Sequence, residues 1–65
     1  MHSDHTLKIE DAVIGEDVIV IKPDSFMYNK IGQIWKVVVR GDRVRVSVCF
    51  EGEIYNFNLE GLSLA

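Results

Sequence analysis

The strongest chemical signal in this sequence is a cluster of basic residues between positions 36 and 45. Lys36, Arg40, Arg43 and Arg45 occur there with one acidic residue, Asp42, which makes a local charge of +3 in a chain whose net charge is −3. Guanidinium and ammonium groups bind carboxylates and phosphates. One short basic segment in an acidic chain is not the broad basic surface of a general nucleic-acid binder. The cluster therefore predicts a face that attracts an acidic protein.

Residues able to catalyse a reaction are not grouped in this sequence. Both histidines, His2 and His5, fall in the polar N-terminal segment. Their spacing suits a metal site on one helical face, but a mobile tail is the expected interpretation. Cys49 is the only cysteine, which excludes an internal disulfide, and beside Ile34 in the predicted hairpin it is expected to be inert. No phosphate-binding loop or dinucleotide fingerprint occurs, so we expect no enzyme activity, no metal and no cofactor.

The length of the chain limits what it can bind. Sixty-five residues make one domain at most, and a domain of about 60 residues buries only roughly 60% of the surface of its unfolded chain. A thin core without a deep cavity is expected. The hydrophobic content of 48% predicts a folded chain. The start of the chain has no signal-peptide pattern and no apolar run is long enough to span a bilayer, so a cytoplasmic location is expected, free or on a membrane complex.

Short β-branched runs separated by turn residues predict an all-β fold. The expected architecture is a small five-stranded SH3-like barrel over residues 12–65, because closure removes the exposed edges of a sheet. A flexible extension over residues 1–11 would precede it, in which Leu7 and Ile9 add a short strand or pack on the barrel. The expected strands lie at 17–22, 31–40, 43–50, 54–58 and 62–64, with one 3₁₀ turn at 59–61 before the last strand.

The central hairpin has the clearest pattern. Gly41-Asp42 is a two-residue loop of the I′ or II′ type, and this loop sets the pairing of the two strands. Trp35 then lies on the core side, so that Trp35→Ala would cost about 3–5 kcal/mol. The predicted pairs on the core side are Val39/Val44, Val37/Val46, Trp35/Val48 and Gln33/Phe50. The opposite face carries Lys36, Arg40, Arg43 and Arg45.

Two explanations for this basic face remain open. Like charges side by side destabilise a sheet, so their arrangement needs a reason. One reason is solubility, with Glu51 or Glu53 as ion-pair partners, and the other is a docking patch for an anionic partner.

A second candidate surface is the loop between the first two expected strands. Phe26, Met27 and Tyr28 follow one another there. Large side chains in a loop either pack on their own domain or contact a partner.

The segment over residues 15–34 has an order of residue types that is moderately specific. It reads GEDVIVIKPDSFMYNKIGQI: a glycine, a Val-rich strand, a basic residue, Pro-Asp-Ser, three large side chains and Ile-Gly-Gln-Ile. This order resembles the opening of photosystem I reaction-centre subunit IV, the E subunit. The resemblance continues through Val46-Ser47-Val48-Cys49-Phe50 and closes with Asn56-Phe57 and Glu60-Gly61-Leu62.

The resemblance implies an SH3-like barrel without a cofactor on the cytoplasmic or stromal face of photosystem I. Such a subunit contacts the core subunits and helps to dock ferredoxin. Phe26, Met27 and Tyr28 would then pack between the barrel and its neighbours. The sequence departs from the family in a short loop at 51–55, in an added acidic N-terminal extension, and in Cys49, which replaces a basic residue that the family uses toward ferredoxin.

Three functions are therefore open. The chain resembles a docking subunit at the thylakoid membrane, in which the three arginines would replace the missing charge at Cys49. It would alternatively be a protein-interaction module of a different complex, packed through the loop at 26–28. A small nucleic-acid-binding barrel is the third, which the net charge of −3 disfavours.

Overall fold

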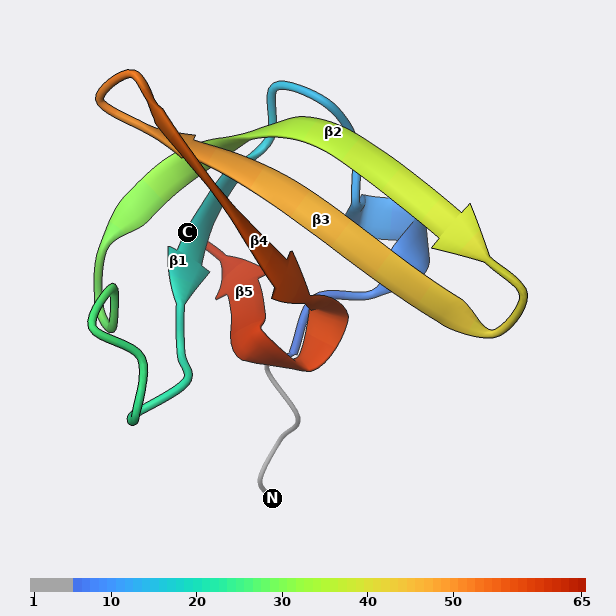
Figure 1. Cartoon of the computed structure of the whole chain (residues 1–65), viewed down its shortest axis with the longest axis horizontal. Helices are drawn as coiled ribbons and strands as arrows, with labels where there is room; N and C mark the ends of the chain where they lie inside the picture. The colour runs from blue at the N-terminus through green and yellow to red at the C-terminus, as the bar shows by residue number, and fades with distance from the viewer. Residues whose placement is uncertain (1–5) are drawn as a thin grey trace.

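The computed structural model describes residues 6–65 and confirms the all-β prediction. Five antiparallel strands form one sheet in the order β4-β3-β2-β1-β5, with two 3₁₀ turns and no α-helix among these residues (Figure 1). The 3₁₀ turn before the last strand lies where it was predicted. The elements are η1 (Ile9–Asp11), β1 (Asp17–Val20), β2 (Ile31–Arg40), β3 (Arg43–Phe50), β4 (Glu53–Asn58), η2 (Leu59–Gly61) and β5 (Leu62–Leu64).

Two tight turns shape the three longest strands. Gly41-Asp42 joins β2 to β3, and only Gly41 has a positive φ, 61°, which is the pattern of a type II′ turn. Glu51-Gly52 joins β3 to β4 with positive φ at both residues, 51° and 90°, as in a type I′ turn. The second loop is shorter than predicted, because Glu53 already pairs with β3 as the first residue of β4.

Glu51 is an unfavourable residue for this type I′ turn. The left-handed conformation costs roughly 1 kcal/mol for an ordinary residue, whereas asparagine tolerates it. We expect Glu51→Asn to raise the free energy of unfolding by about 0.5–1 kcal/mol, measured by urea denaturation. Glu51→Gln is the matched control, because it removes the charge without supplying a turn-forming residue. Equal stabilisation by both variants would assign the effect to charge and contradict the backbone explanation.

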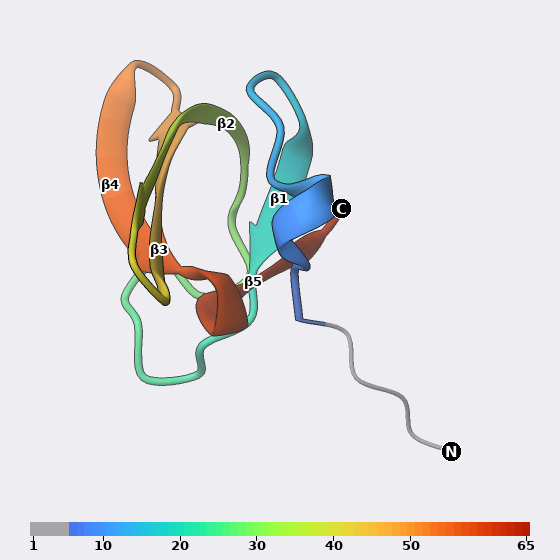
Figure 2. The same cartoon turned by 90° about the vertical axis from the view of Figure 1, so that its right-hand side faces the viewer.

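The sheet curls but does not close into the predicted barrel. β4 and β5 remain its two edges, and no ladder joins them within residues 6–65. All three residues of β5 pair with β1, and Leu7 occupies part of the other side of β5, where its amide donates to the carbonyl of Leu62. η2 carries the chain from β4 at one edge of the sheet to β5 at the other. Figure 2 shows β2, β3 and β4 curled on one side of the molecule and β1 with β5 on the other.

A β-bulge in β2 overturns part of the predicted hairpin register. From the turn to Lys36/Ser47 the observed pairs agree with the prediction, but Ile34 then pairs with Val48. Trp35 is the additional residue, and bulges of this kind re-aim side chains. Ile34 is 2% exposed, whereas Trp35 is 55% exposed. The predicted place of Trp35 in the core is therefore wrong, and every predicted pair beyond the bulge is shifted by one residue.

The core lies inside the curl of the sheet. Leu7, from the N-terminal segment, belongs to it, and its amide donates a hydrogen bond to the carbonyl of Leu62 at 2.7 Å. Packing was one of the two behaviours expected of Leu7, while the histidines His2 and His5 lie outside the described residues. The buried apolar cluster consists of Leu7, Val18, Val20, Met27, Ile34, Val46, Val48, Phe50 and Leu62.

Candidate functional site

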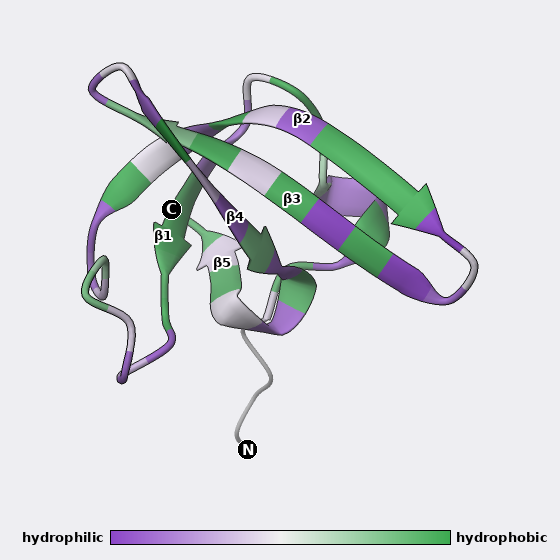
Figure 3. Ribbon diagram, viewed as in Figure 1, coloured by the Kyte–Doolittle hydropathy of each residue, from purple (hydrophilic) through white to green (hydrophobic). Residues whose placement is uncertain are grey.

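The four basic residues of the predicted patch lie on the outer face of the β2–β3 hairpin, and all four are exposed. Cross-strand pairing places Arg40 beside Arg43 next to the turn, and Lys36 beside Ser47 further along the hairpin. Midway between these two pairs, Arg45 on β3 pairs with Val38 on β2 and with Asn58 on β4. In Figure 3 polar and apolar bands alternate along β3, as expected for a strand with one face toward the core. We call Lys36, Arg40, Arg43 and Arg45 the basic face.

The basic face has no carboxylate partner within residues 6–65. Glu51 and Glu53, the expected partners, follow the far end of β3, which covers roughly 23 Å between Arg43 and Phe50. Glu53 instead accepts a hydrogen bond from the hydroxyl of Tyr55 at 3.0 Å. This hydrogen bond, with desolvation and the carboxylate charge, raises the pKa of Tyr55. The predicted ion pairs that would explain the basic face by solubility are therefore not formed.

The basic face stands on paired strands and not on a mobile loop. Lys36 and Arg45 lie within ladders, and the row that contains Lys36 is held by a hydrogen bond from Ser47 Oγ to Asn56 Oδ1 at 2.6 Å. Ser47 is itself buried. Side chains mounted on such a scaffold keep their spacing, which a binding surface requires.

The loop between β1 and β2 divides its three large residues between core and surface. Met27 is 7% exposed and joins the core, whereas Phe26 is 78% and Tyr28 47% exposed. The amide of Met27 donates to Ser25 Oγ at 3.1 Å, which shapes the loop locally. The ring of Phe26 meets that of Tyr55 edge to face, with centroids 5.5 Å apart. The predicted packing on the domain is therefore confirmed for Met27, whereas Phe26 and Tyr28 are exposed, with Phe26 the most exposed of the three.

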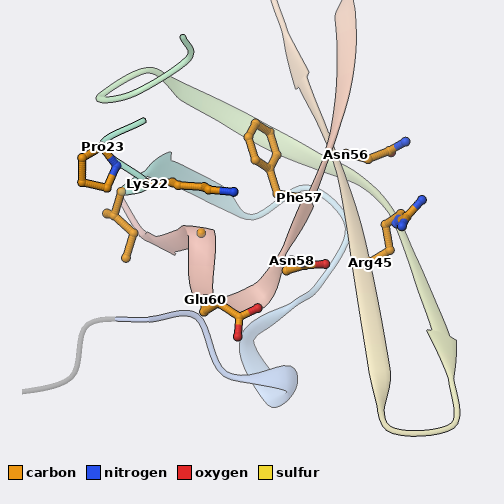
Figure 4. Close-up of a pocket in the computed structure, with 9 residues that line it drawn as sticks. Lys22, Pro23, Arg45, Asn56, Phe57, Asn58 and Glu60 are labelled. Carbon is orange, nitrogen blue, oxygen red and sulfur yellow. The ribbon is translucent and has the colours of Figure 1, made fainter. Parts of the chain in front are cut away.

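A groove beside β4 was not foreseen from the sequence. It has a volume of about 540 Å³ and lies between the start of the β1–β2 loop and the corner formed by β4 and η2 (Figure 4). Lys22 extends across it toward β4, and Arg45 links it to the basic face. The alternation in Asn56-Phe57-Asn58 was its only sequence signal, and any edge strand can show that pattern. The lining includes Lys22, Arg45, Asn56, Phe57, Asn58 and Glu60.

Cys49 lies on β3, two residues beyond Ser47, the partner of Lys36, and further along the strand from the three arginines. It is half-buried, and its sheet neighbours are Gln33 and Ile54, which carry no charge.

Within residues 6–65 there is no group of three or more side chains suited to bind a metal ion. In the same part of the chain no helix has the length and apolar character to cross a membrane.

Comparison of the chain with protein-family models, characterised proteins and solved structures gives no match. Function must therefore be inferred from three features of the fold: the basic face, the exposed loop and the groove beside β4.

Proposed function

We propose that this chain is a non-catalytic docking module whose basic face receives an acidic protein. The observation that carries this proposal is a set of four exposed cations on one face of a rigid hairpin, without a carboxylate partner in the described part of the chain. Cations in this arrangement attract and orient an anionic partner. The remainder of the chain is acidic, since the net charge is −3, and this confines the attraction to the basic face.

Ferredoxin, an acidic electron carrier, is the partner we propose, in line with the resemblance to the E subunit of photosystem I. The chain would then be a peripheral subunit on the cytoplasmic side of the thylakoid membrane that assists docking and stabilises the complex. Cys49 has uncharged neighbours in the sheet, so the role of the family's basic residue at that place would pass to Arg40, Arg43 and Arg45. The docking site would thereby move toward the tip of the hairpin.

Charge reversal on the basic face is the test of this proposal. We expect ferredoxin, titrated at low ionic strength, to shift the amide resonances of Arg40–Arg45, and we expect added salt to weaken the binding. Arg43→Glu should weaken the affinity by roughly tenfold, because it replaces an attraction by a repulsion at an exposed site. Lys30→Glu is the matched control, since Lys30 is exposed in the β1–β2 loop at the other end of β2. Equal loss with both variants, or no shift at any accessible concentration, would refute the proposal.

The exposed ring of Phe26 supports a second candidate function, a packing module of another complex. Phe26 and Tyr28 present aromatic surface beside the anchored Met27. A complex of this kind would lose affinity with Phe26→Ser and keep it with Arg43→Glu, which is the opposite of the result expected for docking through the basic face.

A further inference from the structure

The two edges of the sheet differ in how they are covered. At β5, the amide of Leu7 donates to the carbonyl of Leu62 at 2.7 Å, so the N-terminal segment occupies part of this edge. At β4, the only ladder within residues 6–65 is the one to β3. An uncovered strand edge is a template for a further strand.

The pairing of β4 with β3 identifies the backbone groups on the open edge. Residues that flank a two-residue hairpin loop, here Phe50 and Glu53, exchange both backbone hydrogen bonds. Hydrogen-bonded pairs alternate along an antiparallel ladder, so the amides of Ile54, Asn56 and Asn58 and the carbonyls of Ile54 and Asn56 point away from β3. The carbonyl of Asn58 belongs to η2, of which Asn58 is the N-cap. The open edge therefore presents three donors and two acceptors in the spacing that an added strand requires.

The groove described above runs along this edge, and its charge indicates what the edge binds. A second, wider groove of about 920 Å³ between η2 and the hairpin shares Arg45, Asn58 and Glu60 with it. Together the two are lined by four basic residues and only two acidic ones, whereas the whole chain has a net charge of −3. The basic residues are Lys22, Arg40, Arg43 and Arg45, and the acidic ones are Asp42 and Glu60.

We propose that the open edge of β4 binds an extended acidic segment of the partner protein, which adds to the sheet as a further strand. Such strand addition derives affinity from main-chain hydrogen bonds and specificity from alternate side chains. This inference rests on the proposed function, because it takes the partner to be acidic, and it names the part of that partner that is recognised.

Alternation of side chains defines the sequence that this edge prefers. Phe57 lies on the inner side of β4, and Asn56 with Arg45 lies on the outer side (Figure 4). Every second residue of an added strand would pack inward on Phe57 and Tyr55, which lie in one aromatic cluster with Phe26 and Phe50. The residues between them would bring carboxylates to the cations of the groove. The ligand is therefore an extended peptide in which apolar and acidic residues alternate.

A proline at position 58 tests the main-chain contact. The backbone of Asn58 has φ −85°, and its side chain makes no capping hydrogen bond to η2. Proline fits this φ and is tolerated on edge strands, so Asn58→Pro removes one outward donor and leaves the pairs of β4 with β3 in place. Asn58→Ala is the matched control, because it shortens the side chain and keeps the donor.

The probe is a short synthetic peptide of alternating valine and glutamate, compared with one of valine and lysine. We expect the unmodified chain to prefer the glutamate peptide, and the amides of Ile54, Asn56 and Asn58 to exchange more slowly with solvent when it is bound. Asn58→Pro should weaken binding by about three- to tenfold, the loss of one backbone hydrogen bond, whereas Asn58→Ala should change it by less than about twofold. If Asn58→Pro does not fold, the exchange of these amides in the unmodified chain decides the question.

Several results would overturn the inference. Equal affinity of Asn58→Pro and Asn58→Ala for the glutamate peptide would contradict the main-chain contact. Binding of the glutamate peptide without slower hydrogen exchange of these amides would contradict it as well. Tighter binding of oligouridine than of the glutamate peptide would assign the groove to nucleic acid. Self-association abolished by Asn58→Pro would assign the edge to a second copy of the chain. Ferredoxin binding lost with Arg43→Glu and unchanged with Asn58→Pro would retain the docking function and refute strand addition alone.

Discussion

Truncation of Ile34 is expected to destabilise the domain far more than truncation of Trp35, its larger neighbour. Ile34 is buried in the core, so Ile34→Ala should lower the free energy of unfolding by about 2–5 kcal/mol through lost apolar contact and a residual cavity. The β-bulge directs Trp35 to the surface, and Trp35→Ala should cost only about 1 kcal/mol. Urea denaturation followed by circular dichroism gives both values.

A milder substitution at Ile34 keeps the comparison with Trp35 measurable in a domain of low stability. A chain of this length has a total stability of only about 3–10 kcal/mol, so Ile34→Ala risks complete unfolding. Ile34→Val removes a single methyl group and should cost about 0.5–1.5 kcal/mol, which remains measurable. A larger loss with Trp35→Ala than with Ile34→Ala would place Trp35 in the core and would restore the hairpin register without a bulge.

The second large effect on stability is expected from a substitution at Gly32, where the backbone of β2 lies close to β3 and to core side chains. A Cβ atom at this position would lie 2.6 Å from the carbonyl oxygen of Cys49 and 2.8 Å from side-chain atoms of Val48 and Phe50. The carbonyl belongs to the ladder and cannot move without breaking it. Overpacking of this kind costs roughly 3 kcal/mol, so Gly32→Ala should lower the free energy of unfolding by about that amount in a thermal or urea titration.

Gly61→Ala is the control for this prediction. Gly61 is also buried, but it has no positive φ, and a Cβ there would meet only the Cβ of Lys22 at 3.9 Å, an ordinary van der Waals distance. We expect it to change the free energy of unfolding by no more than about 0.5 kcal/mol, with a gain from the stiffer unfolded chain offsetting small losses. Equal losses at both positions would show that the crowding at Gly32 is not the cause.

The bulge explains why the register of the hairpin was predicted only in part. Strict alternation from the Gly41-Asp42 turn places Trp35 and Gln33 inward, and it turns Ile34 outward. The bulge reverses this beyond Lys36, so that Ile34 enters the core and the polar Gln33 reaches the surface. The polar Gln33 at an expected core position was the feature of the sequence that indicated an irregular register. An alternating pattern alone does not show where an extra residue is inserted.

The basic face was predictable because it depends on the part of the hairpin next to the turn. A two-residue loop sets the register of its flanking residues, so Arg40, Arg43 and Arg45 share a face whatever happens further along the strands. Lys36 is the last of these residues before the bulge. The groove beside β4 was not predictable in the same way, because Lys22 and Arg45 meet in it from distant parts of the chain.

Local sequence patterns were enough to predict the approximate places of the five strands, the two-residue turn at Gly41-Asp42, the 3₁₀ turn at Leu59–Gly61 and the common face of the basic residues. These depend on backbone preferences and on neighbours a few positions away. Only the tertiary structure shows that Ile34 and not Trp35 enters the core, that the 26–28 loop is divided between core and surface, and that β4 remains an open edge. Each of these depends on contacts between distant segments, whose packing in a shared core no local pattern specifies.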